Sequence, residues 1–255
     1  MSRPVGRIST WAFRRARWLG YRSYYRLVDA NYDHQWLTTE TRTPAGRFRS
    51  YELLARHASD PMLAELDETA GPEAVIYDIG ANVGVYSLAL AVDSPERRLL
   101  AFEPAPRTSS QLQANDDCNS LSDRIEVFAW GVGNEDGTCP FYVSTYPELS
   151  GFDRESATRW EASLAETVEV PIRRVDTIVD SHPIPDALKI DVEGASPAVL
   201  RGARETLESH QPILFIEVHE EGLSADTGRE VREIMDAVDY TIAERDDYWR
   251  CEPQA

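Results

Sequence analysis

The sequence predicts an α/β fold: a doubly wound, mostly parallel sheet with helices on both faces, preceded by an N-terminal helical extension. Short apolar runs bounded by turn residues alternate with helical patterns, which is the arrangement of βαβ units. The chain has 255 residues and 42 % of them are hydrophobic, enough for a substantial core. A glycine-containing turn joins the first buried strand to the first helix of this alternation.

The chain divides into an extension and one domain. Residues 1–45 are rich in arginine and aromatic residues and end at a turn around Pro44-Ala45-Gly46, so we assign residues 46–255 to the domain. A helix is expected to begin at Ser59-Asp60-Pro61, because a capping residue precedes a proline at the first helical position. Gly71-Pro72 ends this helix.

The remaining elements follow in chain order. Five strands are expected over Val75–Tyr77, Leu99–Phe102, Ile125–Ala129, Ala187–Val192 and Ile213–Val218. Helices are expected through Val85–Val92, Ser110–Asn115 and Val199–Leu207. A helix over Thr227–Val238 and a strand over Tyr240–Ala243 complete the sheet. An inserted pair of strands is expected over Phe141–Val143 and Val168–Ile172. The loop between them, from Ser144 to Glu166, is either a lid over the open edge of the sheet or a disordered acidic segment.

Charge is distributed unevenly along the chain. The 26 basic side chains are outnumbered by 44 acidic ones, a net charge of −18. Seven arginines and no acid lie in residues 1–28, so 19 basic and 44 acidic side chains give residues 29–255 a net charge of −25. Lys189 is the one lysine in the sequence. This acidic surface repels polyanions, which excludes nucleic acid as a partner, and it is typical of proteins adapted to concentrated salt.

The compartment is predicted to be the cytoplasm. No secretory signal and no apolar run long enough to span a bilayer is visible. Cys118, Cys139 and Cys251 are odd in number and far apart, so we expect reduced thiols and no structural zinc site. Residues 1–28 leave two alternatives open: a basic helix at the inner membrane surface, or an arm that packs on the acidic domain. The oligomeric state is not indicated.

The turn after the first strand predicts a nucleoside cofactor. The segment reads Asp78-Ile79-Gly80-Ala81-Asn82-Val83-Gly84, and its G-x-x-x-G spacing differs from the G-x-G-x-x-G of dinucleotide sites. Glu103 follows the second strand and can accept hydrogen bonds from both ribose hydroxyls. This combination favours S-adenosylmethionine, with Asp78 facing its ammonium or sulfonium group. A purely structural glycine turn is the alternative. The candidate cofactor-binding residues are Asp78, Gly80, Asn82, Gly84, Glu103 and Pro104.

A second group of charged residues ends the fourth and fifth strands. Lys189, Asp191 and Glu193 share one strand face in Lys189-Ile190-Asp191-Val192-Glu193-Gly194, and Glu217-Val218-His219 ends the next strand. Charges on a buried strand are costly unless they lie at its open end and are used. The alternative is a self-neutralising cluster that caps the following helix.

These motifs resemble the FkbM family of S-adenosylmethionine-dependent methyltransferases over about residues 72–245. The resemblance rests on the glycine turn, Phe102-Glu103-Pro104, the block from Leu188 to Ala195 and Glu217-Val218-His219. It implies a class I methyltransferase fold, Rossmann-like in topology, and O-methylation of sugars, polyketides or other secondary metabolites. Ser196 stands where the family commonly has another acid, and Asp239-Tyr240 stands where it has Gly-Tyr.

Methyl transfer from a sulfonium needs alignment and, for a hydroxyl acceptor, a base. His219 is the candidate base, because histidine titrates near neutral pH, although a histidine that only ends the strand is the alternative. Glu193 or Asp191 could orient it or bind the acceptor, and Lys189 could stabilise oxyanion charge. A uronic acid carboxylate would need no base. Asp191, Glu193 and Glu217 could also hold Mg²⁺, but we expect no required metal.

Two other functions are considered: a non-catalytic binding module and a dinucleotide oxidoreductase. The first would predict loss of Asp78 or Glu103, and both are present. The second is opposed by the G-x-x-x-G spacing. We therefore expect an O-methyltransferase with a glycan, glycolipid or small-molecule acceptor.

The acidic charge predicts salt-dependent stability. Self-repulsion among the excess acids should destabilise the folded state in dilute buffer, and salt should screen it. The melting temperature, followed by circular dichroism, should therefore rise between low and molar KCl. A flat profile would contradict this reading.

Overall fold

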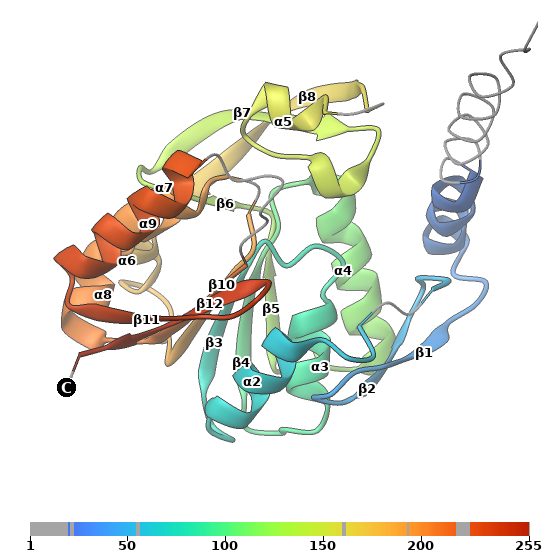
Figure 1. Cartoon of the computed structure of the whole chain (residues 1–255). Coiled ribbons are helices and arrows are strands. Elements are labelled where there is room, and N and C mark those ends of the chain that lie inside the picture. The colour runs from blue at the N-terminus through green and yellow to red at the C-terminus, as the bar shows by residue number, and fades with distance from the viewer. Residues whose placement is uncertain are drawn as a thin grey trace, which may run out of the picture.

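The computed structural model describes residue 20 and residues 23–54, 57–159, 162–192, 194–217 and 225–254. Its central sheet has seven strands in the order β11-β12-β10-β9-β3-β4-β5 (Figure 1). The strands are β3 (Val75–Ile79), β4 (Arg98–Phe102), β5 (Ile125–Phe128), β9 (Ala187–Ile190), β10 (Ile213–Glu217), β11 (Tyr240–Glu244) and β12 (Tyr248–Pro253). Strands β5, β4, β3, β9 and β10 pair in parallel, and β12 is antiparallel to both of its neighbours. The predicted doubly wound, mostly parallel sheet is confirmed.

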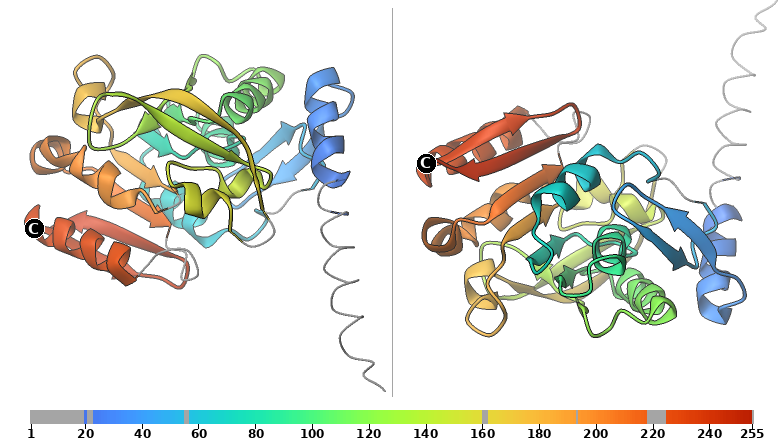
Figure 2. Two further views of the ribbon diagram at one scale, coloured as in Figure 1. Left: turned by 90° about the horizontal axis from the view of Figure 1, so that it is seen from above. Right: turned by 90° about the horizontal axis from the view of Figure 1, so that it is seen from below.

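Helices cover both faces of this sheet (Figures 1 and 2). Three of them, α2 (Pro61–Thr69), α3 (Val85–Val92) and α4 (Pro106–Asn119), pack on one face in a core with Ile76 and Phe215. The opposite face holds α6 (Val175–Ile178), α7 (Ser196–Arg201), α8 (Arg204–His210) and α9 (Ala225–Ala237). Both faces of the strands are buried, because successive residues such as Ile76 and Tyr77 enter opposite cores.

The inserted strands form a separate three-stranded sheet, β6-β8-β7. Its members are β6 (Gly131–Val132), β7 (Gly137–Ser144) and β8 (Leu164–Arg173). The predicted pair is confirmed and is longer than expected, with Phe141 opposite Val168 in antiparallel register. Between β7 and β8 the described residues include a 3-10 turn, η1 (Pro147–Leu149), and a short helix, α5 (Arg154–Ala157). This hairpin lies over the carboxyl ends of the central strands (Figure 2).

Two parts of the central fold differ from the prediction. Strand β12 was not expected; it carries Arg250 and Glu252 and therefore lacks a continuous apolar run. The helix expected through Val199–Leu207 is divided into α7 and α8 at Gly202. A Cβ at Gly202 would lie 1.8 Å from the Gly133 carbonyl oxygen, so the break permits a close backbone approach that no local pattern indicates.

The N-terminal part of the described chain packs on α4. Residues 23–34 are helical, and β1 (Thr39–Arg42) pairs with β2 (Arg47–Ser50) in a hairpin absent from the sequence prediction. Asn115 of α4 holds both segments: its Nδ2 donates to the Tyr32 hydroxyl oxygen at 2.8 Å, and its Oδ1 accepts from the Tyr51 amide at 3.0 Å. The proposed boundary at residue 45 falls in the turn of this hairpin, and the division into domains stays a prediction. Most of the arm, residues 1–19, 21 and 22, lies outside the described residues.

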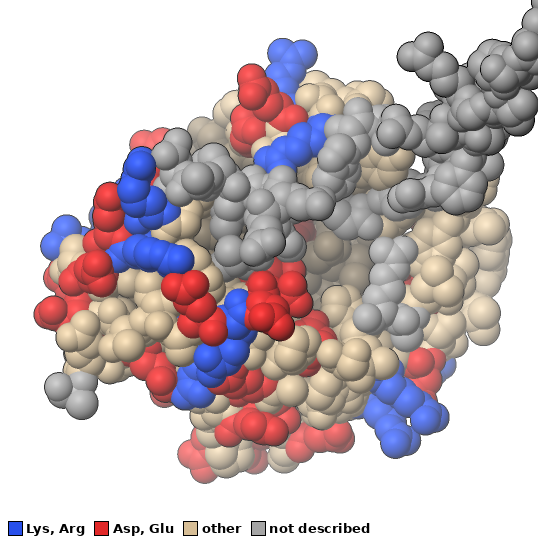
Figure 3. Space-filling model, viewed as in Figure 1, with Lys and Arg blue, Asp and Glu red and all other residues tan. Residues whose placement is uncertain are grey.

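Cys118, Cys139 and Cys251 are free cysteines, of which Cys251 is buried. Across the described ranges, no helix combines the length and the apolar character needed to cross a bilayer. On the face shown in Figure 3, acidic and basic side chains are mixed over α7, α9 and β12.

Glu65 connects α2 to the last two strands. It accepts hydrogen bonds from Arg245 Nη2 and Arg250 Nη1, each at 3.0 Å, and from the Tyr248 hydroxyl. Burial alone would raise the pKa of Glu65, but the hydrogen bonds from Tyr248, Arg250 and Arg245 lower it from 4.5 to about 2. The charged carboxylate therefore stabilises the fold above about pH 4.5, and this contribution is lost as the pH falls toward 2.

We expect Glu65→Gln to reduce the free energy of unfolding by about 1–3 kcal/mol at pH 7, because a hydrogen-bonded charge is removed from three partners. Urea unfolding at pH 7 and pH 4 measures the loss, which should be smaller at the lower pH. Glu68→Gln, an exposed change on the same helix, is the control. Equal effects of the two substitutions would refute this role of Glu65.

Candidate functional site

A turn of unusual backbone conformation follows β3. Gly80, Asn82 and Gly84 have φ of 80°, 51° and 88°, in the left-handed region that favours glycine. A Cβ at Gly80 would lie 1.8 Å from the Asp191 carbonyl oxygen, so glycine is needed where the turn meets the segment after β9. A Cβ at Gly84 would lie 2.9 Å from Leu112 Cγ on α4. The turn therefore presents backbone closely against both β9 and α4.

Glu103 closes the turn from the end of β4. Its Oε2 accepts a hydrogen bond from the Asn82 amide at 3.0 Å, and its Oε1 accepts one from the Ala105 amide at 2.9 Å. Glu103 is only 7 % exposed. Burial raises the pKa of Glu103 to about 7, although the two backbone hydrogen bonds and the Lys189 charge oppose this shift. A ligand that donates hydrogen bonds to this carboxylate would stabilise its charged form.

Glu103 and the glycine turn line a cavity of about 270 Å³ at the carboxyl ends of β3, β4, β9 and β10. We call it the cofactor cavity; its walls include Gly80, Asn82, Glu103, Pro104, Asp191 and Glu217. Phe152 and Ser150 close it from the β7–β8 hairpin. The strand order reverses between β3 and β9, which is where doubly wound sheets bind their ligands.

Lys189 lies directly beneath this cavity and is 2 % exposed. Its ammonium donates to the Gly80 carbonyl oxygen at 3.0 Å and forms ion pairs with Asp78 Oδ1 at 3.1 Å and Asp191 Oδ2 at 3.4 Å. Burial alone would lower the pKa of Lys189, but the charges of Asp78, Asp191 and Glu217 outweigh it and raise the pKa. Lys189 is therefore a cation held in place by at least three oxygen atoms.

Asp78 lies one layer deeper than the sequence led us to expect. Its carboxylate is fully buried, and Oδ2 accepts a hydrogen bond from the Ser87 hydroxyl at 2.7 Å. Because its other oxygen faces Lys189, Asp78 acts on the cavity through Lys189 and the Gly80 carbonyl. In this buried position the Asp78 carboxylate does not reach the cofactor cavity, so it cannot contact a ligand ammonium or sulfonium directly. An effect of Asp78 on cofactor binding stays a prediction.

The other predicted site residues divide into two groups. Asp191 and Glu217 are brought together at the cofactor cavity by the ends of β9 and β10. Glu193 and His219 lie outside the described residues. Among the residues that the structure places, no group of three or more His, Cys, Asp or Glu side chains is arranged to hold a metal ion.

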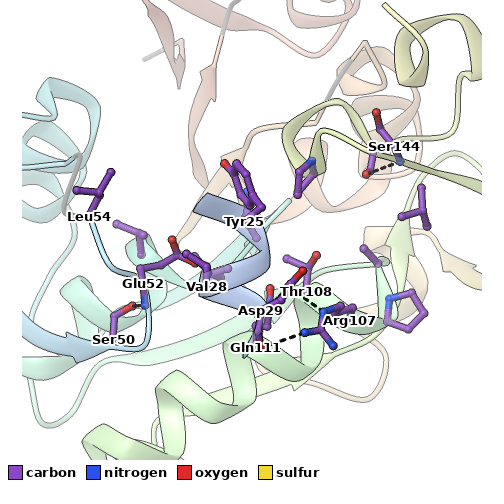
Figure 4. Close-up of a pocket in the computed structure, with 18 of the residues that line it drawn as sticks. Tyr25, Val28, Asp29, Ser50, Glu52, Leu54, Arg107, Thr108, Gln111 and Ser144 are labelled. Carbon is purple, nitrogen blue, oxygen red and sulfur yellow. Dashed lines mark hydrogen bonds and ion pairs between the residues drawn. The ribbon is translucent and has the colours of Figure 1, made fainter. Parts of the chain in front are cut away.

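A larger cavity of about 560 Å³ adjoins the first and was missed by sequence reasoning. We call it the N-terminal cavity. Helix 23–34, the β1–β2 hairpin and the segment through His57 form one wall, and α4 and the β7–β8 hairpin form the others (Figure 4). The segment from Ser144 to Glu166, expected to be a lid or a disordered acidic loop, contributes Ser144 of β7, Thr145 and Glu166 of β8 to this cavity. Its role as a lid stays a prediction. Nothing in the sequence indicates that Glu52 and His57 line the same cavity as these residues, since tertiary packing alone brings the segments together.

Comparison with known proteins shows one family over most of the chain. The sequence model described as "Methyltransferase FkbM domain" matches residues 78–242. The chain is 28 % identical to the 31-O-demethyl-FK506 methyltransferase FkbM of Streptomyces tacrolimicus over 177 residues, which are 58 % of this chain and 66 % of that protein. It is 27 % identical over 154 residues to the hexuronic acid methyltransferase AglP of Haloferax volcanii, 60 % of this chain and 59 % of that protein.

The structural similarity supports the same fold. The methyltransferase FkbM of Methylobacillus flagellatus matches with a TM-score of 0.50 and 20 % identity, over 71 % of this chain and 44 % of that one. The chain spans about 60 % of the AglP length and 9 % of the AMB antimetabolite synthetase AmbE of Pseudomonas aeruginosa, to which it is 27 % identical over 192 residues, 62 % of this chain.

The raised pKa of Glu103 makes nucleoside binding pH-dependent. Ribose hydroxyls that donate to the carboxylate favour its charged form, so affinity for S-adenosylhomocysteine should fall as the pH drops below about 7. Calorimetry between pH 5.5 and 8.5 tests this.

Two variants complete the test. Glu103→Gln should weaken binding by about 1–3 kcal/mol at pH 8 and flatten the pH dependence. Glu126→Gln, on the neighbouring strand β5 and exposed, is the control. Unchanged affinity in the Glu103 variant would remove this residue from the cofactor site.

Proposed function

Because the chain belongs to the FkbM methyltransferase family, we propose that it is an S-adenosylmethionine-dependent O-methyltransferase. The acceptor we propose is a sugar hydroxyl or a uronic acid carboxylate of a glycan or glycolipid. A small secondary metabolite is the second candidate, favoured by the similarity to a methyltransferase that acts on 31-O-demethyl-FK506. The sugar acceptor is favoured by similarity to the hexuronic acid methyltransferase AglP and to the 2-O-methyltransferase NoeI of Sinorhizobium fredii, 28 % identical over 149 residues, 53 % of this chain and 60 % of that protein.

The observation that carries the proposal is the buried Glu103 carboxylate, which is hydrogen-bonded to the glycine turn and lines the cofactor cavity. Each Glu103 carboxylate oxygen accepts one hydrogen bond from a backbone amide and has a second lone pair that can accept one from a ribose hydroxyl. The carboxylate can therefore bind a nucleoside. We assign Gly80, Asn82, Gly84, Glu103 and Pro104 to cofactor binding, with Asp78 acting through Lys189. When bound, S-adenosylmethionine supplies an electrophilic methyl group on a sulfonium.

The chain's own residues would orient the acceptor and take up its proton. Asp191 and Glu217 line the cofactor cavity, and in the sequence Glu193 and His219 follow them by two residues each. We keep His219 as the candidate base for a hydroxyl acceptor and Glu193 and Asp191 as residues that orient it or bind the acceptor. Lys189 carries a positive charge close to Asp191, and we propose that its field favours a developing oxyanion.

We place the activity in the cytoplasm. Residues 1–28 are basic and aromatic in sequence, and we propose that they contact anionic lipid at the inner membrane surface. Such contact would bring the site near lipid-linked glycans.

The proposal is tested by methyl transfer. The purified chain is incubated with labelled S-adenosylmethionine and separated fractions of cell glycans, lipids and small metabolites. We expect label in a glycan or glycolipid fraction, stable to mild base for a methyl ether and released by it for a methyl ester. Label in the small-metabolite fraction alone would favour the second candidate, and no transfer to any fraction would contradict the function.

His219→Ala separates the two acceptor types. For a hydroxyl acceptor, turnover should fall about 10²–10⁴-fold with nearly unchanged cofactor affinity, because a general base is lost. His210→Ala, an exposed change at the end of α8, is the matched control. An unchanged rate in the His219 variant would indicate a carboxylate acceptor or another base.

A further inference from the structure

The N-terminal cavity opens beside the cofactor cavity, and the two share part of their walls. Asn82, Ala105, Thr108, Pro147 and Ser150 line both. A molecule in the N-terminal cavity therefore lies next to the nucleoside site, with only the glycine turn and the start of α4 between them. At about 560 Å³ this space is large enough for one or two sugar rings.

The lining of the N-terminal cavity is largely apolar, and acidic and hydroxyl-bearing side chains are set among the apolar ones. Glu52, two residues after β2, and Glu166 of β8 both line it, as do the hydroxyl-bearing Ser50, Thr108 and Ser144. Carboxylate and hydroxyl oxygens accept hydrogen bonds from the hydroxyl groups of a polyol. They repel a carboxylate or phosphate brought to the same place.

Among the described residues that line this cavity, the arginine is Arg107, and it is already engaged. Arg107 Nε donates to Asp29 Oδ1 at 2.9 Å, and its Nη2 donates to Asp33 Oδ1 at 3.1 Å. Gln111 Nε2 also donates to Asp29 Oδ1, at 3.1 Å. Figure 4 shows Asp29 of helix 23–34 beside Arg107 and Gln111 of α4. An anionic acceptor would have to compete with two carboxylates for this guanidinium.

A histidine with a fixed orientation completes the wall. His57 Nδ1 lies 3.1 Å from Asp60 Oδ2, while Asp60 Oδ1 accepts from the Leu63 amide at 3.0 Å and from the Tyr86 hydroxyl at 2.8 Å. Burial would raise the pKa of Asp60, but hydrogen bonds from His57, Leu63 and Tyr86 lower it. The ionised carboxylate can only accept, so Nδ1 of His57 donates to it and Nε2 is the ring nitrogen left to bond a hydroxyl.

We propose that the N-terminal cavity is the acceptor site and that it binds a polyhydroxylated molecule, such as a sugar residue, that carries no negative charge. Glu52, Glu166 and His57 accept hydrogen bonds from its hydroxyl groups. This inference rests on the proposed methyltransferase function and narrows its acceptor from hydroxyl or carboxylate to hydroxyl. It also gives residues 23–57 a role in acceptor choice.

The test uses two sets of probes that differ in one group. Methyl hexopyranosides of the gluco, galacto and manno series are compared with the matching methyl hexopyranosiduronates, in which a carboxylate replaces the primary alcohol. Binding to the full chain saturated with S-adenosylhomocysteine is measured by saturation-transfer NMR titration. We expect at least one neutral glycoside to bind, and its uronate to bind at least tenfold more weakly.

A pair of variants locates the binding in the cavity. Glu166→Lys reverses a charge on the cavity wall and should reduce the preference for the neutral glycoside at least fivefold. Glu169→Lys makes the same change in net charge on the same strand, three residues away on its opposite face and exposed, and should leave the preference unchanged. Glu166→Gln, a milder change, should shift the preference in the same direction if the lysine variant does not fold.

The outcomes are separable from those of the proposed function. If S-adenosylhomocysteine fails to bind, the methyltransferase function itself is wrong. If it binds but no neutral glycoside does, or the uronates bind equally well, the acceptor proposal is overturned while the function stands. Equal responses of the Glu166 and Glu169 variants would place the probes outside the N-terminal cavity and would also overturn it.

Discussion

The buried ammonium of Lys189 is the interaction on which the site depends. It binds the Gly80 carbonyl oxygen, Asp78 and Asp191 at once, and so connects β9, β3 and the turn between β3 and α3. Its position 4.9 Å above the Tyr86 ring adds a contact that suits a cation. Removing one partner of such a buried pair commonly costs about 3–5 kcal/mol, because the remaining charge is left uncompensated. The single lysine of an otherwise lysine-free chain therefore stands where a compact cation is required.

The glycine turn depends on this interaction for its shape. With its carbonyl held by Lys189, Gly80 adopts a positive φ and lets the Asp191 backbone approach. The same turn offers the Asn82 amide to Glu103, which fixes the carboxylate at the mouth of the cofactor cavity. Cofactor binding and sheet packing are thus supported by one connected set of contacts.

The N-terminal segment contributes a second kind of constraint. Tyr32 and Tyr51 pack on α4 through Asn115, and this contact brings helix 23–34 and the hairpin to the side of the domain that carries the cofactor cavity. The wall so formed faces the β7–β8 hairpin, and both segments are additions to the central sheet (Figures 1 and 2). The central sheet positions the nucleoside, while the added segments shape the space for an acceptor.

The sequence by itself determined the alternation of strands and helices, the glycine turn, Glu103 and the charged ends of β9 and β10, because each depends on neighbouring residues and on the shared edge of parallel strands. It did not indicate β12 or the pairing of β1 with β2, because charged residues in these strands interrupt the apolar pattern. It did not indicate the break at Gly202 either, because the close approach of the Gly133 backbone has no local signal. It placed Asp78 against a ligand, whereas the fold buries it against Lys189, 111 residues further along the chain. Only the tertiary structure placed Glu52, His57 and Glu166 around one cavity, because contacts between segments this distant in sequence are set by packing and have no local pattern.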